Sequence, residues 1–100
     1  MVPFEFEAKL WQYTGKGGWY FLSIPPLISM EIRSIFKNQE EGWGRLKTTA
    51  TIHNISWETA IWFSAKDNMY LLPVKTDIRK RTQIKAGDLV MARTSFFLNL

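Results

Sequence analysis

The chain has 100 residues, which is enough for one domain with one hydrophobic core and too short for two. Hydrophobic residues make up 46% and charged residues 22%, the composition of a globular protein and not of a disordered one. The net charge of +4 is too small to indicate polyanion binding by itself, and the absence of cysteine excludes disulfide frameworks, thiolate zinc sites, cysteine nucleophiles and iron–sulfur clusters.

The N-terminal quarter predicts two strands joined by a turn. From Phe4 to Leu10 apolar and charged residues alternate, which places Phe4, Phe6, Ala8 and Leu10 on one face of a strand. The glycine-rich residues 15–18 predict a hairpin turn, because they lack the spacing of a phosphate-binding loop and precede a strand. A second strand is expected at residues 19–24, where two prolines end it.

The hydrophobic period then changes. Apolar residues from Ile28 to Phe36 recur at i, i+4, i+7 and i+8, which is one stripe of a helix. We predict the principal helix from about Ser29 to Lys37, with Ser29 as its N-cap and Glu31 in its first turn.

The rest of the chain predicts more strands and one short helix. Alternating or β-favouring residues indicate strands at residues 45–53, 56–64, 69–72 and 89–98. A short basic helix is expected at residues 75–82, with Ile78 as its apolar anchor. Residues 84–88 predict a tight turn in which Gly87 supplies the backbone freedom and the Asp88 carboxylate accepts from nearby amides.

These elements make residues 1–100 a single, mainly β domain. Short connections favour antiparallel pairing, and about six strands with aromatic residues on both faces favour a small closed barrel with one principal helix. We expect the following side chains to be mostly buried: Phe4, Phe6, Leu10, Trp19, Ile32, Phe36, Ile52, Trp57, Ile61 and Leu71. No basic stretch leads into an apolar run at the start, and no apolar run approaches the roughly twenty residues of a membrane span. We therefore expect a soluble, cytoplasmic protein.

The order of several short motifs resembles one known family. The motifs are Leu10-Trp11, a glycine turn, Trp19, Ile24-Pro25 before a helix, Trp57-x-Thr59, Tyr70-Leu71-Leu72-Pro73-Val74-Lys75, Arg79 and Ile84-Lys85-x-Gly87-Asp88-x-Val90. In this order they resemble the domain of unknown function 1905 family over nearly the whole chain. The resemblance implies a double-split β-barrel of the kind seen in AF/PG-like hypothetical proteins, with the AbrB and MazE transcription factors in a sister superfamily. It implies no activity.

The chain departs from the family pattern at two places. His53-Asn54 stands where family members usually carry glycines, and residues 59–63 read Thr-Ala-Ile-Trp-Phe in place of Thr-Ser-Leu-Phe-Pro. An activity that depended on that serine would be missing from this protein.

Three single residues are weak candidates for a site. His53 is the only histidine and has no cysteine to join it as a metal ligand, so we expect an exposed or turn-stabilising role. Among the carboxylates only Glu58 lies within an aromatic strand, where partial burial would make it a lead for ligand contact. Trp43, between two glycines, is either a plug for one end of the barrel, which we favour, or an exposed stacking platform.

The basic residues cluster in one stretch. Five of the thirteen Lys and Arg residues fall within eleven positions, with Asp77 as the only acid among them: Lys75, Arg79, Lys80, Arg81 and Lys85. Such a cluster is usually a solvated face, and the alternative is a local polyanion-binding patch.

The sequence therefore predicts a non-enzymatic β-barrel module that acts by binding, with no catalytic residue, cofactor or metal ligand assigned. The alternative is a nucleic-acid-binding or regulatory protein by analogy with the AbrB and MazE barrels. A hydrolase or isomerase is the least favoured class, because no pairing of a nucleophile with a base can be named.

Overall fold

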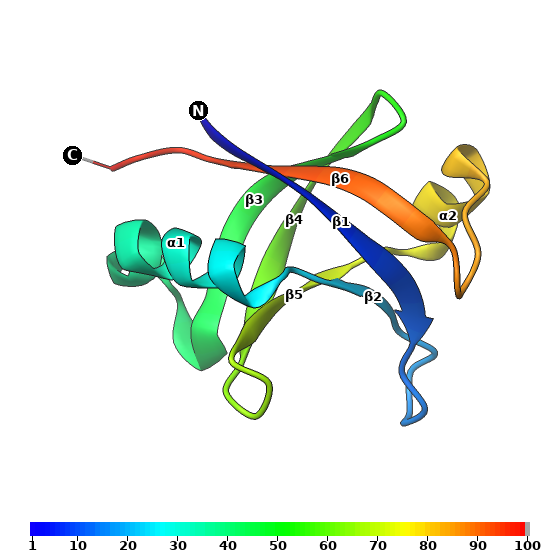
Figure 1. The fold of residues 1–100 in the computed structure, drawn as a ribbon, viewed down its shortest axis with the longest axis horizontal. Coiled ribbons are helices and arrows are strands. Elements are labelled where there is room, and N and C mark those ends of the chain that lie inside the picture. Colours follow the sequence, from blue (N-terminus) through cyan, green and yellow to red (C-terminus); the bar gives the residue numbers. More distant parts are fainter. Residues whose placement is uncertain (100) are drawn as a thin grey trace.

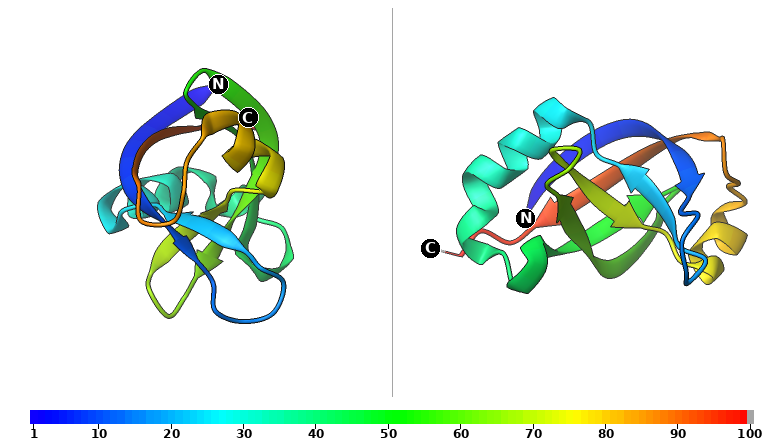
Figure 2. Two further views of the ribbon diagram at one scale, coloured as in Figure 1. Left: turned by 90° about the vertical axis from the view of Figure 1, so that its right-hand side faces the viewer. Right: turned by 90° about the horizontal axis from the view of Figure 1, so that it is seen from below.

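A computed structural model describes residues 1–99 and contains a closed barrel of antiparallel strands with a helix at each end (Figures 1 and 2). The strands follow one another around the barrel in the order β1-β2-β5-β4-β3-β6, and β6 pairs with β1 to close it. In chain order the elements are β1 (Val2–Gln12), β2 (Tyr20–Ser23), α1 (Pro26–Phe36), β3 (Arg45–Ile52), β4 (Ile55–Ser64), β5 (Met69–Pro73), α2 (Thr76–Thr82) and β6 (Leu89–Phe96). Short 3-10 turns, Lys37–Gln39 and Gly42–Gly44, separate α1 from β3. The predicted mainly β barrel is confirmed.

The interior of the barrel is filled by alternate side chains of the strands. Along β3 every second residue from Leu46 to Ile52 is buried, as the alternation of the sequence predicts. Beneath α1, the rings of Phe4, Phe36 and Phe96 pack together, with centroids 5.0 to 6.4 Å apart. Eight of the ten predicted core residues are buried: Phe4, Phe6, Leu10, Ile32, Phe36, Ile52, Trp57 and Ile61.

Two of the predicted residues lie outside the core, and for Trp19 the predicted burial is wrong. Trp19 is 50% exposed, because it precedes β2 at the end of the hairpin turn and lies outside the barrel wall. Leu71 is only partly buried, because it points to the outer face of β5 while Tyr70 and Leu72 point inward. Three apolar residues in succession show no alternation, so the pattern left the inward positions of this strand undefined.

The principal helix begins three residues earlier than predicted. Pro26 occupies its first turn, where a missing N–H costs nothing, and Pro25 is the N-cap residue. Ser29 is therefore inside the helix and is not its N-cap, and Glu31 is not in the first turn. The Ser29 side chain is fully buried: its hydroxyl donates to the Ile24 carbonyl at 2.8 Å and accepts from the Tyr70 amide at 3.0 Å.

The turns explain one departure from the family pattern and confirm two predictions. His53 and Asn54 form the two-residue turn between β3 and β4, and both have positive φ, 50° and 66°, the conformation in which glycine is favoured. Residues 15–18 lie in the hairpin turn between β1 and β2, as expected. Near α2, the Lys85 amide donates to the Asp88 carboxylate at 2.8 Å, which confirms the predicted tight turn.

The two helices occupy opposite ends of the barrel. Figure 1 shows α1 at the end near both termini and α2 at the other end, beside the turn that enters β6. Ile78 anchors α2 in the core, as predicted. Within residues 1–99, neither helix has the length and apolar character of a membrane span.

Candidate functional site

Trp43 does not plug the barrel. Its side chain is 91% exposed, and its backbone has φ +69° in the short turn Gly42–Gly44. Glu41 and Arg45 exchange backbone hydrogen bonds in both directions and form an ion pair, so they hold the turn out from the wall. The α1 end of the barrel is closed by α1 and its phenylalanine cluster instead. The role of Trp43 as a stacking platform stays a prediction.

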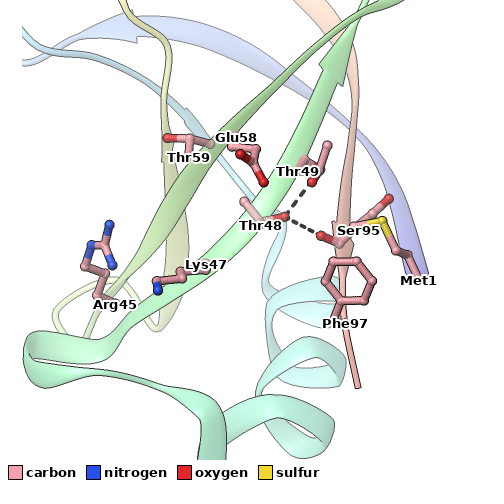
Figure 3. A pocket seen from close by; sticks show the side chains of 9 residues that line it. All are labelled: Met1, Arg45, Lys47, Thr48, Thr49, Glu58, Thr59, Ser95 and Phe97. Atoms are coloured by element: carbon pink, nitrogen blue, oxygen red, sulfur yellow. Dashed lines mark hydrogen bonds between the residues drawn. The ribbon is translucent and has the colours of Figure 1, made fainter. Parts of the chain in front are cut away.

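Glu58 is exposed, which contradicts the predicted partial burial. Strand alternation places Trp57 in the core, so its neighbour Glu58 points outward beside Thr49 of β3. It lines a shallow cleft of about 430 Å³ together with Arg45 and Lys47 (Figure 3). At the floor of this cleft the Thr48 hydroxyl donates to the Ser95 carbonyl at 2.9 Å, a bond that fastens β3 to β6.

His53 stabilises a turn, as expected. Its Nδ1 lies 3.1 Å from the carbonyl oxygen of Thr82, so it connects the β3–β4 turn to the end of α2. No group of three His, Cys, Asp or Glu side chains gathers as a metal site within residues 1–99.

The basic cluster of α2 consists of Lys75, Arg79, Lys80, Arg81 and Lys85. Arg79 is half-buried and the other four are exposed. Within residues 1–99 the ion pairs are Arg33–Glu40, Arg45–Glu41, Lys47–Glu41 and Arg93–Glu5. All five cations of the cluster are therefore free of an acidic partner there.

Arg79 has a structural role that separates it from the rest of the cluster. Its guanidinium lies over the Tyr20 ring, 3.6 Å from the centroid. Nε donates to the Val74 carbonyl at 3.2 Å, and Nη2 donates to the Thr76 hydroxyl at 2.9 Å. This side chain fastens α2 to β2, whereas the lysines around it make no such contact in the described chain.

A further concave surface is an aromatic cleft that the sequence did not predict. It has a volume of about 790 Å³ and lies on the outer face of β1, β2, β5 and β4. Five partly or largely exposed aromatic side chains line it: Trp11, Tyr13, Trp19, Phe21 and Trp62. Leu71 adds to its apolar floor, and Lys16, Lys66 and Asp67 lie at its polar margin.

The rings of the aromatic cleft are held in place by neighbouring strands. Trp11 pairs with Phe21 across β1 and β2, with ring centroids 5.2 Å apart, and its Nε1 donates to Ser23 at 2.9 Å. Trp19 lies parallel to Phe21 at 6.0 Å. The sequence holds one signal of this surface: Trp11 follows Glu5, Glu7 and Lys9 in the outward positions of the first strand.

One buried titratable group lies beneath α1. The hydroxyl of Tyr70 donates to the Glu40 carboxylate, and Arg33 lies 3.9 Å from the same carboxylate. Burial raises the pKa of Tyr70, and the hydrogen bond and negative charge of Glu40 raise it further. Arg33 also lies over the Phe63 ring at 3.6 Å, so this group connects α1 to β4 and β5.

A family model described as "Domain of unknown function (DUF1905)" matches residues 6–93, from the first strand to the last. A comparison with curated proteins finds no match.

Proposed function

We propose that this chain, which belongs to the domain of unknown function 1905 family, is a non-enzymatic module that binds a ring-bearing apolar ligand in the aromatic cleft. The observation that carries the proposal is the gathering of Trp11, Trp19 and Trp62, with two further rings, around one surface of about 790 Å³. Ligand sites are typically about 300–1,000 Å³ and lined by aromatic side chains with a few polar groups at the margin. Soluble proteins rarely leave a patch of this kind exposed without a partner.

The local roles of the titratable residues support the non-enzymatic part of the proposal. The His53 ring is bonded through Nδ1 to the Thr82 carbonyl, and within residues 1–99 no serine, threonine or tyrosine hydroxyl is hydrogen-bonded to it. Glu58 is exposed, whereas a carboxyl that acts as a general acid is usually tuned by a buried, apolar environment.

A neutral fluorescent ring compound, N-phenyl-1-naphthylamine, tests the aromatic cleft. We expect its fluorescence to rise on binding and Trp62→Ala to weaken binding at least tenfold, which is about 1.4 kcal/mol. Trp43→Ala is the matched control, because this tryptophan is more exposed and does not line the cleft. Absence of binding, or an equal loss in Trp43→Ala, would refute the proposal.

The alternative function is nucleic-acid binding through the basic cluster of α2, and the lack of acidic partners for its cations within residues 1–99 favours it. Because Arg79 has a structural role, the test uses the exposed residues Lys80, Arg81 and Lys85, all changed to alanine. If the cluster binds labelled single-stranded DNA or RNA, this change should reduce the salt slope by about two to three units. Lys37→Ala, at the α1 end, is the control. No binding of the unchanged protein at low salt would end this alternative.

A further inference from the structure

A second cleft, of about 360 Å³, shares Trp19 with the aromatic cleft and is here named the α2 cleft. It is lined by the glycine turn after β1, by Trp57 and Thr59 of β4, and by residues 73–76 with Arg79. The glycine turn and α2 lie at the same end of the barrel in Figure 1 and in the right-hand view of Figure 2. Its volume is at the lower end of the range of small-molecule sites, which is about 300–1,000 Å³.

The charge of the α2 cleft is uniformly positive. Lys75 and Arg79 line it, no acidic side chain does, and neither cation has an ion-pair partner within residues 1–99. Arg79 is already oriented by Tyr20 and by its bonds to Val74 and Thr76. A guanidinium has five N–H donors, and these contacts use two nitrogens, so donors remain for a ligand. A planar, fixed guanidinium suits the geometry of phosphate and carboxylate oxygens.

The α2 cleft also offers ring surface next to these cations. Trp57 lies in the core and contributes to the floor, while Trp19 is 50% exposed and forms a wall. Gly17 lets the indole of Trp19 lie against the turn: a Cβ at this position would come within 2.6 Å of Trp19 Nε1, and the φ of Gly17 is +101°. Thr59 and Thr76 also line the cleft with their hydroxyl-bearing side chains, and the Thr76 hydroxyl already accepts from Arg79.

We infer that the α2 cleft binds a small ligand in which a planar ring carries an anionic group, either a phosphate or a carboxylate. The ring packs against Trp19 and Trp57, and the anion is held by Lys75 and Arg79. An uncharged ring would leave both cations without a partner, and an anion without a ring would leave Trp19 exposed. This inference goes beyond the proposed function, because it concerns a different cleft and a charged ligand.

The test uses two pairs of compounds that differ in charge. Adenosine 5′-monophosphate is compared with adenosine, and indole-3-acetate with indole-3-acetamide, by calorimetry and by the NMR signals of the indole N–H groups. We expect the charged member of at least one pair to bind at least tenfold more tightly than its uncharged partner. Trp19 and Trp57 should show the largest shifts. The pair that responds identifies the combination of ring and anion that the cleft accepts.

Variants locate the site. Lys75→Ala changes an exposed side chain, so the fold should persist, and we expect binding of the anion to weaken at least fivefold. Arg79→Gln should weaken it further. Arg81→Ala is the matched control, because Arg81 is an exposed cation of the same helix that does not line the cleft. Trp62→Ala removes a ring of the aromatic cleft, and we expect its affinity for the anionic compound to stay within twofold of that of the unchanged protein. This variant therefore distinguishes binding in the α2 cleft from binding in the aromatic cleft.

Three results would overturn the inference: no binding of any of the four compounds, equal binding of charged and uncharged members in both pairs, or equal weakening by Arg81→Ala and Lys75→Ala. The last result would indicate general attraction to the basic cluster. If the protein binds one of the anionic compounds but not the neutral naphthylamine, the proposed function is refuted and this inference stands.

Discussion

Replacement of Ser29 by alanine should destabilise the barrel far more than the loss of one hydroxyl suggests. Ser29 lies inside α1, fully buried, and its hydroxyl serves two backbone groups that belong to different segments. It donates to the Ile24 carbonyl, which follows β2, and it accepts from the Tyr70 amide, which belongs to β5. Alanine would leave both groups buried without this partner, and water has no access to replace it.

The expected size follows from the cost of an unpaired buried polar group, about 1–3 kcal/mol. Two such groups give a loss of about 2–6 kcal/mol, a large part of the roughly 5–15 kcal/mol that stabilises a domain. With a urea dependence of about 2 kcal/mol per M, the midpoint of unfolding should fall by about 1–3 M.

Ser34→Ala is the matched control for urea unfolding followed by tryptophan fluorescence. Ser34 lies in the same helix and also donates to a carbonyl, that of Glu31. Because this hydrogen bond is exposed, water can replace the Ser34 hydroxyl as the partner of the Glu31 carbonyl. We expect its midpoint to stay within about 0.3 M of the unchanged protein, since surface changes are usually within about 0.5 kcal/mol. Equal midpoints for the Ser29 and Ser34 variants would refute the assigned role of Ser29.

Three further predictions concern the core, the pH dependence and the exposed turn. Phe36→Ala should lower the free energy of unfolding by about 3–5 kcal/mol, because it removes a fully buried ring that packs on Phe4 and Phe96. A urea midpoint near that of the unchanged protein would contradict the burial of this ring. The pKa of Tyr70 is raised in the folded protein, so the contribution of Tyr70 to the free energy of unfolding is complete below the unfolded pKa of about 10 and is lost as the pH rises above it. In that range the free energy of unfolding should fall by up to about 1.4 kcal/mol per pH unit. Tyr70→Phe should remove this pH dependence in urea unfolding measured at a series of alkaline pH values. Trp43→Gly should not lower the thermal midpoint, because the indole is exposed and glycine relieves the positive φ; a clear loss would show that Trp43 contributes to folding.

The sequence predicted the barrel because the alternation of apolar and polar residues identifies most strands within their own segments. The alternation from Phe4 to Leu10 and from Leu46 to Ile52 identifies the inward side chains, which the structure buries, except that Ala8 is only partly buried. The prediction of inward residues and of the helix start was wrong where the local pattern gives no signal or a misleading one. Tyr70, Leu71 and Leu72 do not alternate, and Ser29 resembles an N-cap although the prolines before it already begin the helix.

The candidate surfaces were harder to predict, because they depend on which strands become neighbours. The basic cluster is visible in the sequence, since its residues lie within eleven positions. The aromatic cleft is not, because Trp11 and Trp62 meet on one surface only through the β1–β2, β2–β5 and β5–β4 pairings. Likewise, the sequence does not reveal that Arg79 lies over Tyr20, which removes it from the freely exposed cations.

The closed barrel also limits how this protein can recognise a partner. Because β6 pairs with β1, the strands form a ring without a terminal strand, and helices occupy both ends. Recognition then falls to outward side chains, and β1 shows where their chemistry changes. Its first half carries Glu5 opposite Arg93 of β6, an ordinary solvated pair, whereas its last residues carry Trp11 opposite Phe21 of β2. The change from charged to aromatic coincides with the change of partner strand, so the aromatic cleft is a localised surface and not a general property of the barrel wall.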